Sequence, residues 1–139
     1  MLGCEALLGL IQSTTVTVTL VNQSSNFSVE TAVIYDENEL PREILVQDGF
    51  GIQRDDAIAA GASASFTLSC NDVESLLLED ADLQVLGGLG PDVEGDVLTQ
   101  GDDFQCGDEI IYTFTHSAII VDFNVTVDVQ PGALGSILP

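Results

Sequence analysis

The sequence contains no lysine and no tryptophan, and its only basic side chains besides His116 are Arg42 and Arg54. Against them stand 23 aspartates and glutamates, which give a formal net charge of −21. Proteins that hold nucleic acid by counterion release need clustered cations, which this sequence cannot supply. We therefore expect no nucleic-acid partner and a strongly acidic surface suited to a cation-rich setting.

Motifs of catalysis are also missing. The single histidine, His116, lies in "FTHSAI", where a turn is expected, and no G-x-S-x-G nucleophile elbow is present. The stretch "GGLGPD" lacks the third glycine of a dinucleotide fingerprint. With 23 acids, some carboxylate pair will always lie at a distance suited to glycoside hydrolysis, so that signal has no specificity. The sequence predicts a protein that is not an enzyme and has no cofactor.

What is present indicates one folded domain. Hydrophobic residues make up 45% of the 139 residues, which argues against disorder despite the charge. We divide the chain into an apolar N-terminal segment at 1–14, a folded domain at 15–130 and a C-terminal tail at 131–139.

Two of the three cysteines, Cys70 in "TLSCND" and Cys106 in "DDFQCGDE", are candidates for a disulfide. Neither belongs to a C-x-x-C pair, and no second histidine is available for a zinc site. A bond between them would stabilise the fold by about 3–4 kcal/mol through loop entropy. The alternative is two buried free thiols.

Alternation of apolar and polar residues dominates the chain and predicts strands. "TTVTVTLV" at 14–21 and "FSVETAVIY" at 27–35 read as an antiparallel hairpin joined by "NQSSN". A strand, a turn at Gly61 and the strand "SASFTLS" follow. "ESLLLEDADLQVLGG" at 74–88 favours another hairpin, with a helix start at 76–78 as the alternative.

The last part of the chain holds the clearest hairpin, formed by "EIIYTFT" and "IIVDFNVTVDV" at 109–115 and 119–129. It follows a long Gly- and Asp-rich stretch that ends near Cys106, which we expect to be stapled by the disulfide. About seven to nine strands at this spacing predict an all-β, antiparallel Greek-key β-sandwich.

The order of a strand, an Asn-Ser turn, a second strand and then "AIAAGASASFTLS" resembles the Ig-like and fibronectin-like sandwich modules of secreted bacterial proteins. The resemblance covers roughly residues 15–70, and it rests on turn chemistry and alternation. It implies an Ig-like sandwich in a secreted or envelope protein. It brings no catalytic residues with it.

The start of the chain, "MLGC", resembles the end of a bacterial lipobox, in which a small residue precedes the cysteine that is lipidated. Gly3 fits this pattern, whereas Met1 stands where leucine is usual. The charged region and most of the apolar region of a signal peptide are absent from the sequence as written. Cys4 is therefore a lipidation candidate if the true start lies upstream. The alternative is a short apolar segment, too short to cross a bilayer, that packs on the domain.

Two kinds of site are further candidates. Clustered carboxylates in the long loop offer oxygen ligands for Ca²⁺ but match no EF-hand, and a solvated acidic loop is the alternative. These residues are Asp102, Asp103, Asp108 and Glu109, and Asp92, Glu94 and Asp96 lie nearby in the sequence of the same loop. Three Asn-x-Ser/Thr sequons could accept glycans. Their asparagines are Asn22, Asn26 and Asn124.

Three hypotheses follow. The first is a non-catalytic extracellular or cell-envelope β-sandwich with a structural or binding role, anchored to a membrane through a lipid on Cys4. The second is a self-assembling filament or layer subunit, in which "EALLGLI" and "TTVTVTLV" pair with an open sheet edge of the next copy. The third is a hydrolase that uses acidic residues.

Overall fold

A computed structural model describes residues 14–24, 26–38, 51–85, 90–116 and 122–131. These residues form nine strands and one turn of 3-10 helix at Cys70–Asp72. The strands are β1 (Thr15–Asn22), β2 (Val29–Asp36), β3 (Gly51–Ile58), β4 (Ser63–Ser69), β5 (Ser75–Leu83), β6 (Asp92–Val93), β7 (Leu98–Thr99), β8 (Glu109–His116) and β9 (Phe123–Gln130).

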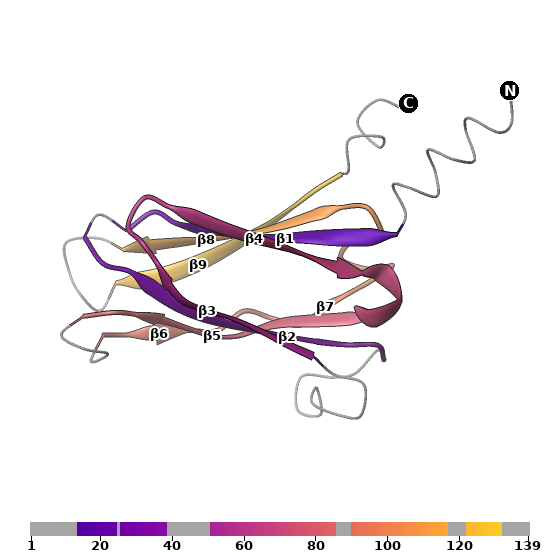
Figure 1. The fold of residues 1–139 in the computed structure, drawn as a ribbon, viewed down its shortest axis with the longest axis horizontal. Coiled ribbons are helices and arrows are strands. Elements are labelled where there is room, and N and C mark those ends of the chain that lie inside the picture. The colour runs from indigo at the N-terminus through magenta and orange to yellow at the C-terminus, as the bar shows by residue number, and fades with distance from the viewer. Residues whose placement is uncertain (1–13, 25, 39–50, 86–89, 117–121, 132–139) are drawn as a thin grey trace, which may run out of the picture.

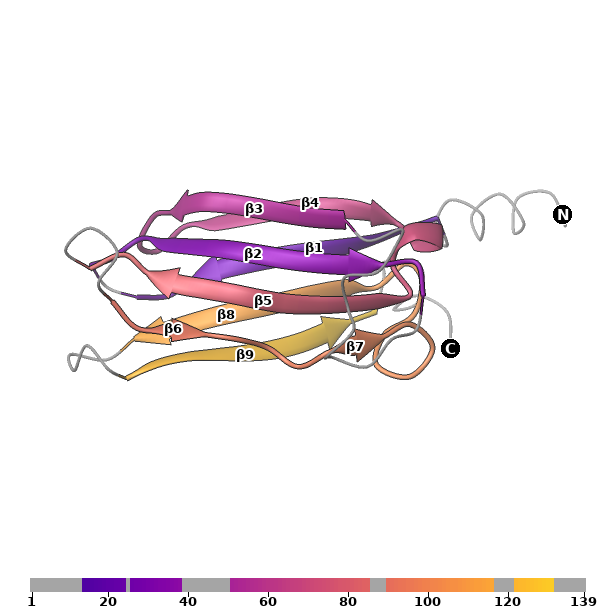
Figure 2. The ribbon, with the colours of Figure 1, turned by 90° about the horizontal axis from the view of Figure 1, so that it is seen from below.

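The strands form two sheets that pack face to face (Figure 1). One sheet has the order β4-β1-β8-β9, and the other has the order β3-β2-β5-β6, with β7 also paired to β5. Seen from the second sheet, the strands of the two layers run in similar directions (Figure 2). The chain crosses between the sheets from β1 to β2, from β3 to β4, from β4 to β5 and from β7 to β8. The predicted β-sandwich is confirmed.

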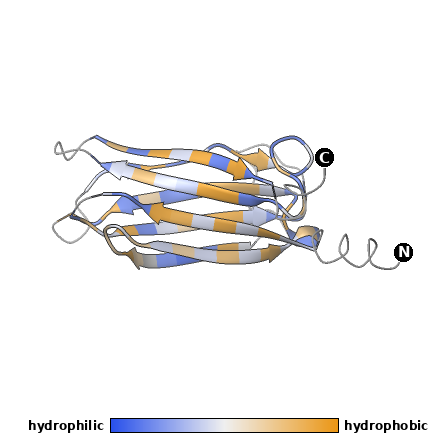
Figure 3. Ribbon diagram, turned by 90° about the horizontal axis from the view of Figure 1, so that it is seen from above, coloured by the Kyte–Doolittle hydropathy of each residue, from blue (hydrophilic) through white to orange (hydrophobic). Residues whose placement is uncertain are grey.

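Strand β1 shows why alternation makes this architecture. Val16, Val18 and Leu20 are fully buried between the sheets, and the threonines between them are partly exposed. The same banding of apolar and polar residues runs along the other strands (Figure 3). The pairing of β1 with β4 is antiparallel, but its pairing with β8 is parallel, which the sequence analysis did not foresee.

The predicted hairpin of 14–21 with 27–35 is wrong. β1 and β2 are both strands, but they belong to different sheets. Asn22 turns the chain across the sandwich: its buried side chain donates hydrogen bonds to the carbonyl oxygens of Phe27 and Ile58, at 2.8 and 2.7 Å. These hydrogen bonds to two other segments hold the chain where it passes from one sheet to the other. The sequence pattern alone does not distinguish such a crossing from a hairpin turn.

The predicted hairpin within 74–88 is also wrong, as is the alternative helix. Residues Ser75–Leu83 form one continuous strand, β5. The register against β2 shifts by one residue, because Leu78 lies opposite Val33 and Asp80 lies opposite Ala32. This bulge at Glu79 reverses which positions face the core, so the alternation breaks although the strand continues. This interruption of the apolar–polar alternation is why the sequence pattern predicts a turn inside a continuous strand.

The other predicted strands are confirmed. Gly61, at φ 78°, lies in the turn between β3 and β4, a conformation that suits glycine. The hairpin of β8 and β9 is antiparallel throughout, with Tyr112 opposite Val127, and residues 117–121 between them lie outside the described part.

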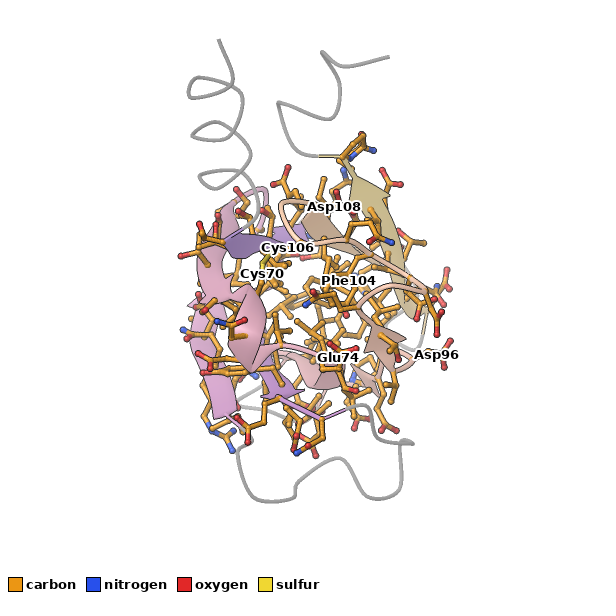
Figure 4. All side chains as sticks on the ribbon, turned by 90° about the vertical axis from the view of Figure 1, so that its right-hand side faces the viewer. Cys70, Glu74, Asp96, Phe104, Cys106 and Asp108 are labelled. Carbon is orange, nitrogen blue, oxygen red and sulfur yellow. A yellow bond between two sulfur atoms is a disulfide. The ribbon has the colours of Figure 1, made fainter. Side chains whose placement is uncertain are left out.

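The core is a continuous layer between the sheets, and Phe104 closes one end of it. This side chain, from the connection between β7 and β8, is 2% exposed and packs in the same cluster as residues from both sheets. In the end-on view, Phe104 lies between the two layers (Figure 4). Because a ring at this position excludes water from the end of the core, it contributes strongly to stability.

We expect Phe104→Ala to lower the free energy of unfolding by about 3–5 kcal/mol, because it removes a buried ring and leaves a cavity. The control is Ile52→Ala on the edge strand β3, where the side chain is 40% exposed and the expected loss is under about 1 kcal/mol. Urea unfolding of the two variants measures both values. Equal losses would show that Phe104 does not close the core.

Candidate functional site

The disulfide predicted between Cys70 and Cys106 is present, with Cα atoms 5.7 Å apart (Figure 4). Cys70 directly follows β4, and Cys106 lies shortly before β8, so the bond joins the two strands that flank β1. The start of β1 is held in the same place, since Thr14 O accepts a hydrogen bond from Cys70 N and Thr15 O accepts one from Gly107 N. The bond therefore brackets the first strand.

The loop between β7 and β8 is fastened by side chains that cap its own turns. Asp103 accepts a hydrogen bond from Thr99 N, and Asp108 accepts one from Gln105 N, both at 2.8 Å. Gln100 donates from its side chain to the carbonyl oxygens of Cys70 and Val73, both at 3.1 Å. These hydrogen bonds fix the conformation of the loop and hold it against the end of the sandwich.

These contacts separate the four residues predicted to bind Ca²⁺. Asp103 and Asp108 cap different turns, Glu109 accepts a hydrogen bond from Thr19 Oγ1 at 2.6 Å, and Asp102 is exposed. A calcium ion needs six to eight oxygens around one point. Within the described ranges, the structure does not bring these four carboxylates together, so the geometry gives the predicted calcium site no support.

The structure gathers a different set of acids on the outer face of the second sheet. Glu30 on β2 lies directly opposite Asp82 on β5, and Asp82 lies directly opposite Asp92 on β6. Asp80 joins this row, and carboxylate oxygens of Asp80, Asp82 and Asp92 lie within 4.8 Å of one another. Of the described residues, these three could hold a cation together. We call Glu30, Asp80, Asp82 and Asp92 the acidic row.

Sequence analysis missed the acidic row because strand pairing creates it. Asp92 is ten positions from Asp82 and meets it only through the register of β5 and β6. The alternation of Glu30 along β2 and of Asp82 along β5 places both on the outer face, but nothing in the sequence sets them side by side. Like charges directly opposite each other on neighbouring strands destabilise a sheet.

The pKa of Asp82 is raised from 3.8 to about 6. Partial burial is the largest cause, followed by a hydrogen bond that the protonated group makes to Asp80. The negative charges of Asp80, Asp92 and Glu30 act in the same direction. Asp82 is therefore the member of the row that takes up a proton first as the pH falls.

The predicted glycan acceptors differ in accessibility. Asn22 is fully buried, and besides its two donated bonds its Oδ1 accepts one from Ser24 N at 2.9 Å. A glycan on Asn22 would break these contacts, so the folded chain does not offer this side chain as an acceptor. Asn26 and Asn124 are exposed, and the side chain of Asn124 donates to Asp122. Only these two sequons remain compatible with the fold.

His116 ends β8 and is partly buried rather than displayed on a surface turn. Its ring packs edge-on against Phe27, with centroids 5.6 Å apart. This contact ties the end of β8 to the segment that enters β2. The residue that follows it, Ser117, lies outside the described part, as do Cys4 and the segment 1–13.

No helix among the described residues is both long and apolar enough to traverse a bilayer. No protein-family model and no curated protein matches the chain. One similar solved structure is an NMR structure of a protein from Eubacterium rectale, at 15% identity and a TM-score of 0.44. The match covers 86% of this chain and 92% of the other. At this level of similarity, it lends no support to an Ig-like or lipoprotein identity.

The double variant Cys70→Ser/Cys106→Ser should lose about 4 kcal/mol of unfolding free energy, because the unfolded chain regains the entropy of the loop that the bond closes. Urea unfolding measures the loss. The control is Cys4→Ser, which leaves the bond intact and should unfold as the unchanged protein does. Wild-type stability in the double variant would mean that the turn hydrogen bonds alone fasten the loop.

Asp82→Asn should raise stability at pH 7 by about 0.5–1 kcal/mol, the range of exposed charge pairs. The pKa of Asp82 is about 6 in the folded state and 3.8 in the unfolded chain. Protonation of Asp82 therefore stabilises the fold fully below pH 3.8, and this stabilisation is lost as the pH rises through 6. The variant should therefore lose this part of the pH dependence between about pH 4 and pH 7. Melting temperatures across this range, with Asp72→Asn as a charge-matched control, test it. An equal gain in the control would indicate net charge alone.

Proposed function

We propose that this protein is a non-catalytic extracellular or cell-envelope β-sandwich domain with a structural role. The observation that carries the proposal is the Cys70–Cys106 disulfide. Structural disulfides persist in oxidising compartments and are rare in the cytosol, where thiols are kept reduced. In this chain the bond fastens the end of the sandwich, which is the use expected of a permanent cross-link.

The surface chemistry supports the same proposal. A formal charge of −21 keeps copies apart and the domain soluble, and in a salt-rich medium counterions screen the repulsion within each copy. A lipid on Cys4 would attach such a domain to a membrane while its charge holds it away from anionic headgroups. The Ig-like identity belongs to the same proposal, on the strength of the strand and turn pattern.

The self-assembly alternative cannot use residues 15–22 as the pairing strand. β1 already has β4 on one side and β8 on the other, so residues 15–22 have no free edge to offer another copy. The edges of the two sheets are β4, β9 and β3, with β6 and β7 along the fourth side. A donated strand would have to come from elsewhere in the chain, and the apolar segment 1–13 lies outside the described residues.

The intact mass of the native protein, expressed from its own locus, tests the proposal. We expect to recover the protein from the extracellular or envelope fraction. Two of its cysteines should react with an alkylating reagent only after reduction. A chain that begins at Cys4 and carries added acyl mass would establish the anchor. A protein with three free thiols in the cytosolic fraction would contradict the proposed extracellular or envelope location.

A further inference from the structure

The open edge of β4 carries no charged side chain. β4 has the sequence SASFTLS and lies at the border of the first sheet, where β1 is its one partner in the described part of the chain. The other long edge strands, β3 and β9, contain Asp55 and Asp128. Proteins commonly place charges, prolines or bulges on edge strands to prevent pairing with another chain. β4 has none of these, and its register against β1 is unbroken.

The backbone of β4 directs a regular row of polar groups towards this edge. Cys70 N donates to Thr14 O at 2.9 Å, and Asn22 N donates to Ala62 O at the same distance. Hydrogen-bonded pairs alternate along an antiparallel ladder, so the even-numbered residues of β4 bond to β1. The odd-numbered residues therefore direct their N–H and C=O groups away from β1. They are Ser63, Ser65, Thr67 and Ser69.

This row is complementary to itself. If a second copy lies antiparallel to the first, with a two-fold axis beside Phe66, then Ser65 lies opposite Thr67 of the second copy and Ser63 lies opposite Ser69. Both members of each pair direct N–H and C=O groups towards the other, so each pair forms two hydrogen bonds. Phe66 then lies opposite its own counterpart at a position without hydrogen bonds, where side chains of neighbouring strands come closest.

The side chains of β4 suit this pairing. Phe66 packs against the core but is only partly buried, because it lies at the border of the sheet. A second Phe66 beside it would cover more of the ring, and aromatic pairs on neighbouring strands stabilise a sheet. On the outer face, Ser65 and Thr67 are exposed and carry hydroxyls that can bond across the strands.

The charge of the chain selects the partner for this edge. A cationic segment of another protein would favour the acidic edges, whereas two copies at −21 repel least where neither presents a carboxylate. On the same side of the sandwich, β3 contacts β4 and carries Arg54 beside its acids (Figure 2). Arg54 is the one arginine or lysine among the described residues.

We propose that two copies of this chain pair through β4 about a two-fold axis, so that their first sheets form one continuous sheet. A contact of seven residues on each side is small for a protein interface, so the dimer is weak and reversible. It forms most readily in high salt, where counterions screen the repulsion between the copies.

Sedimentation velocity of the full chain over a range of concentrations tests this pairing, and it does not depend on the compartment of the protein. We expect a monomer–dimer equilibrium whose Kd falls at least about tenfold between about 0.1 M and about 1 M NaCl, because salt screens the net charge. Non-reducing electrophoresis of the same samples excludes a disulfide between copies through Cys4.

Variants locate the contact. Thr67→Glu should raise the Kd about tenfold, because it adds two carboxylates on neighbouring strands of the dimer. The matched control is Thr126→Glu, at an exposed threonine on the opposite edge of the same sheet, and it should change the Kd by less than about twofold. Mixing Thr67→Glu with Ser65→Lys should restore pairing, because the proposed register sets glutamate opposite lysine. Both threonines are exposed, and thermal melting checks that the variants stay folded.

Hydrogen exchange tests the register directly. The amides of Ser65 and Thr67 should exchange about tenfold more slowly once about nine-tenths of the copies are paired. The amides of Phe66 and Leu68 should be protected at every concentration, since they bond to β1.

The proposal is overturned if the protein stays monomeric at every concentration and salt. Equal weakening by Thr67→Glu and Thr126→Glu would reduce the effect to net charge. A dimer in which Ser65 and Thr67 exchange as in the monomer would use another surface. Species larger than a dimer, with new protection on β9, would replace the two-fold contact by a head-to-tail one.

Discussion

Apolar packing between the two sheets is the interaction on which the rest of this structure depends. With 23 acidic side chains and two arginines, ion pairs cannot balance the charge, so the fold has to hold against its own repulsion. The inner faces achieve this with fully buried valines, leucines and rings such as Tyr112 and Phe114. Most of the described acids lie on outer faces and turns, where water and counterions solvate them, whereas Asp36 at the end of β2 is fully buried. The acidic row shows the cost where strand pairing brings them together.

Much of the fold could be predicted from the sequence, because a strand that is buried on one face has to alternate. The strands β1, β4, β8 and β9 follow from this rule, and the disulfide follows from the lack of any other use for Cys70 and Cys106. The pairing of strands did not follow, since alternation records which face is buried and not which neighbour lies alongside. A single bulged residue, Glu79, was enough to make one strand look like two.

The site residues were harder to predict for a related reason. Proximity along the chain predicts that Asp102, Asp103, Asp108 and Glu109 act together. In the structure Asp103 and Asp108 cap different turns, and Glu109 on β8 accepts a hydrogen bond from Thr19. Conversely, Asp82 and Asp92 meet through the register of a two-residue strand. Such sites become visible only when the pairing is known.

The parallel pairing of β1 with β8 also sets the order in which this chain can fold. Thr19 and Glu109, which share a hydrogen bond, are 90 residues apart. As the chain emerges from its N-terminus, β1 can find β4 early, but its other side stays open until β8 arrives, and distant pairings of this kind form slowly. The arrival of β8 also carries Cys106 to Cys70. The cross-link therefore fastens together the two neighbours of β1, one of which lies close to it along the chain and the other far from it.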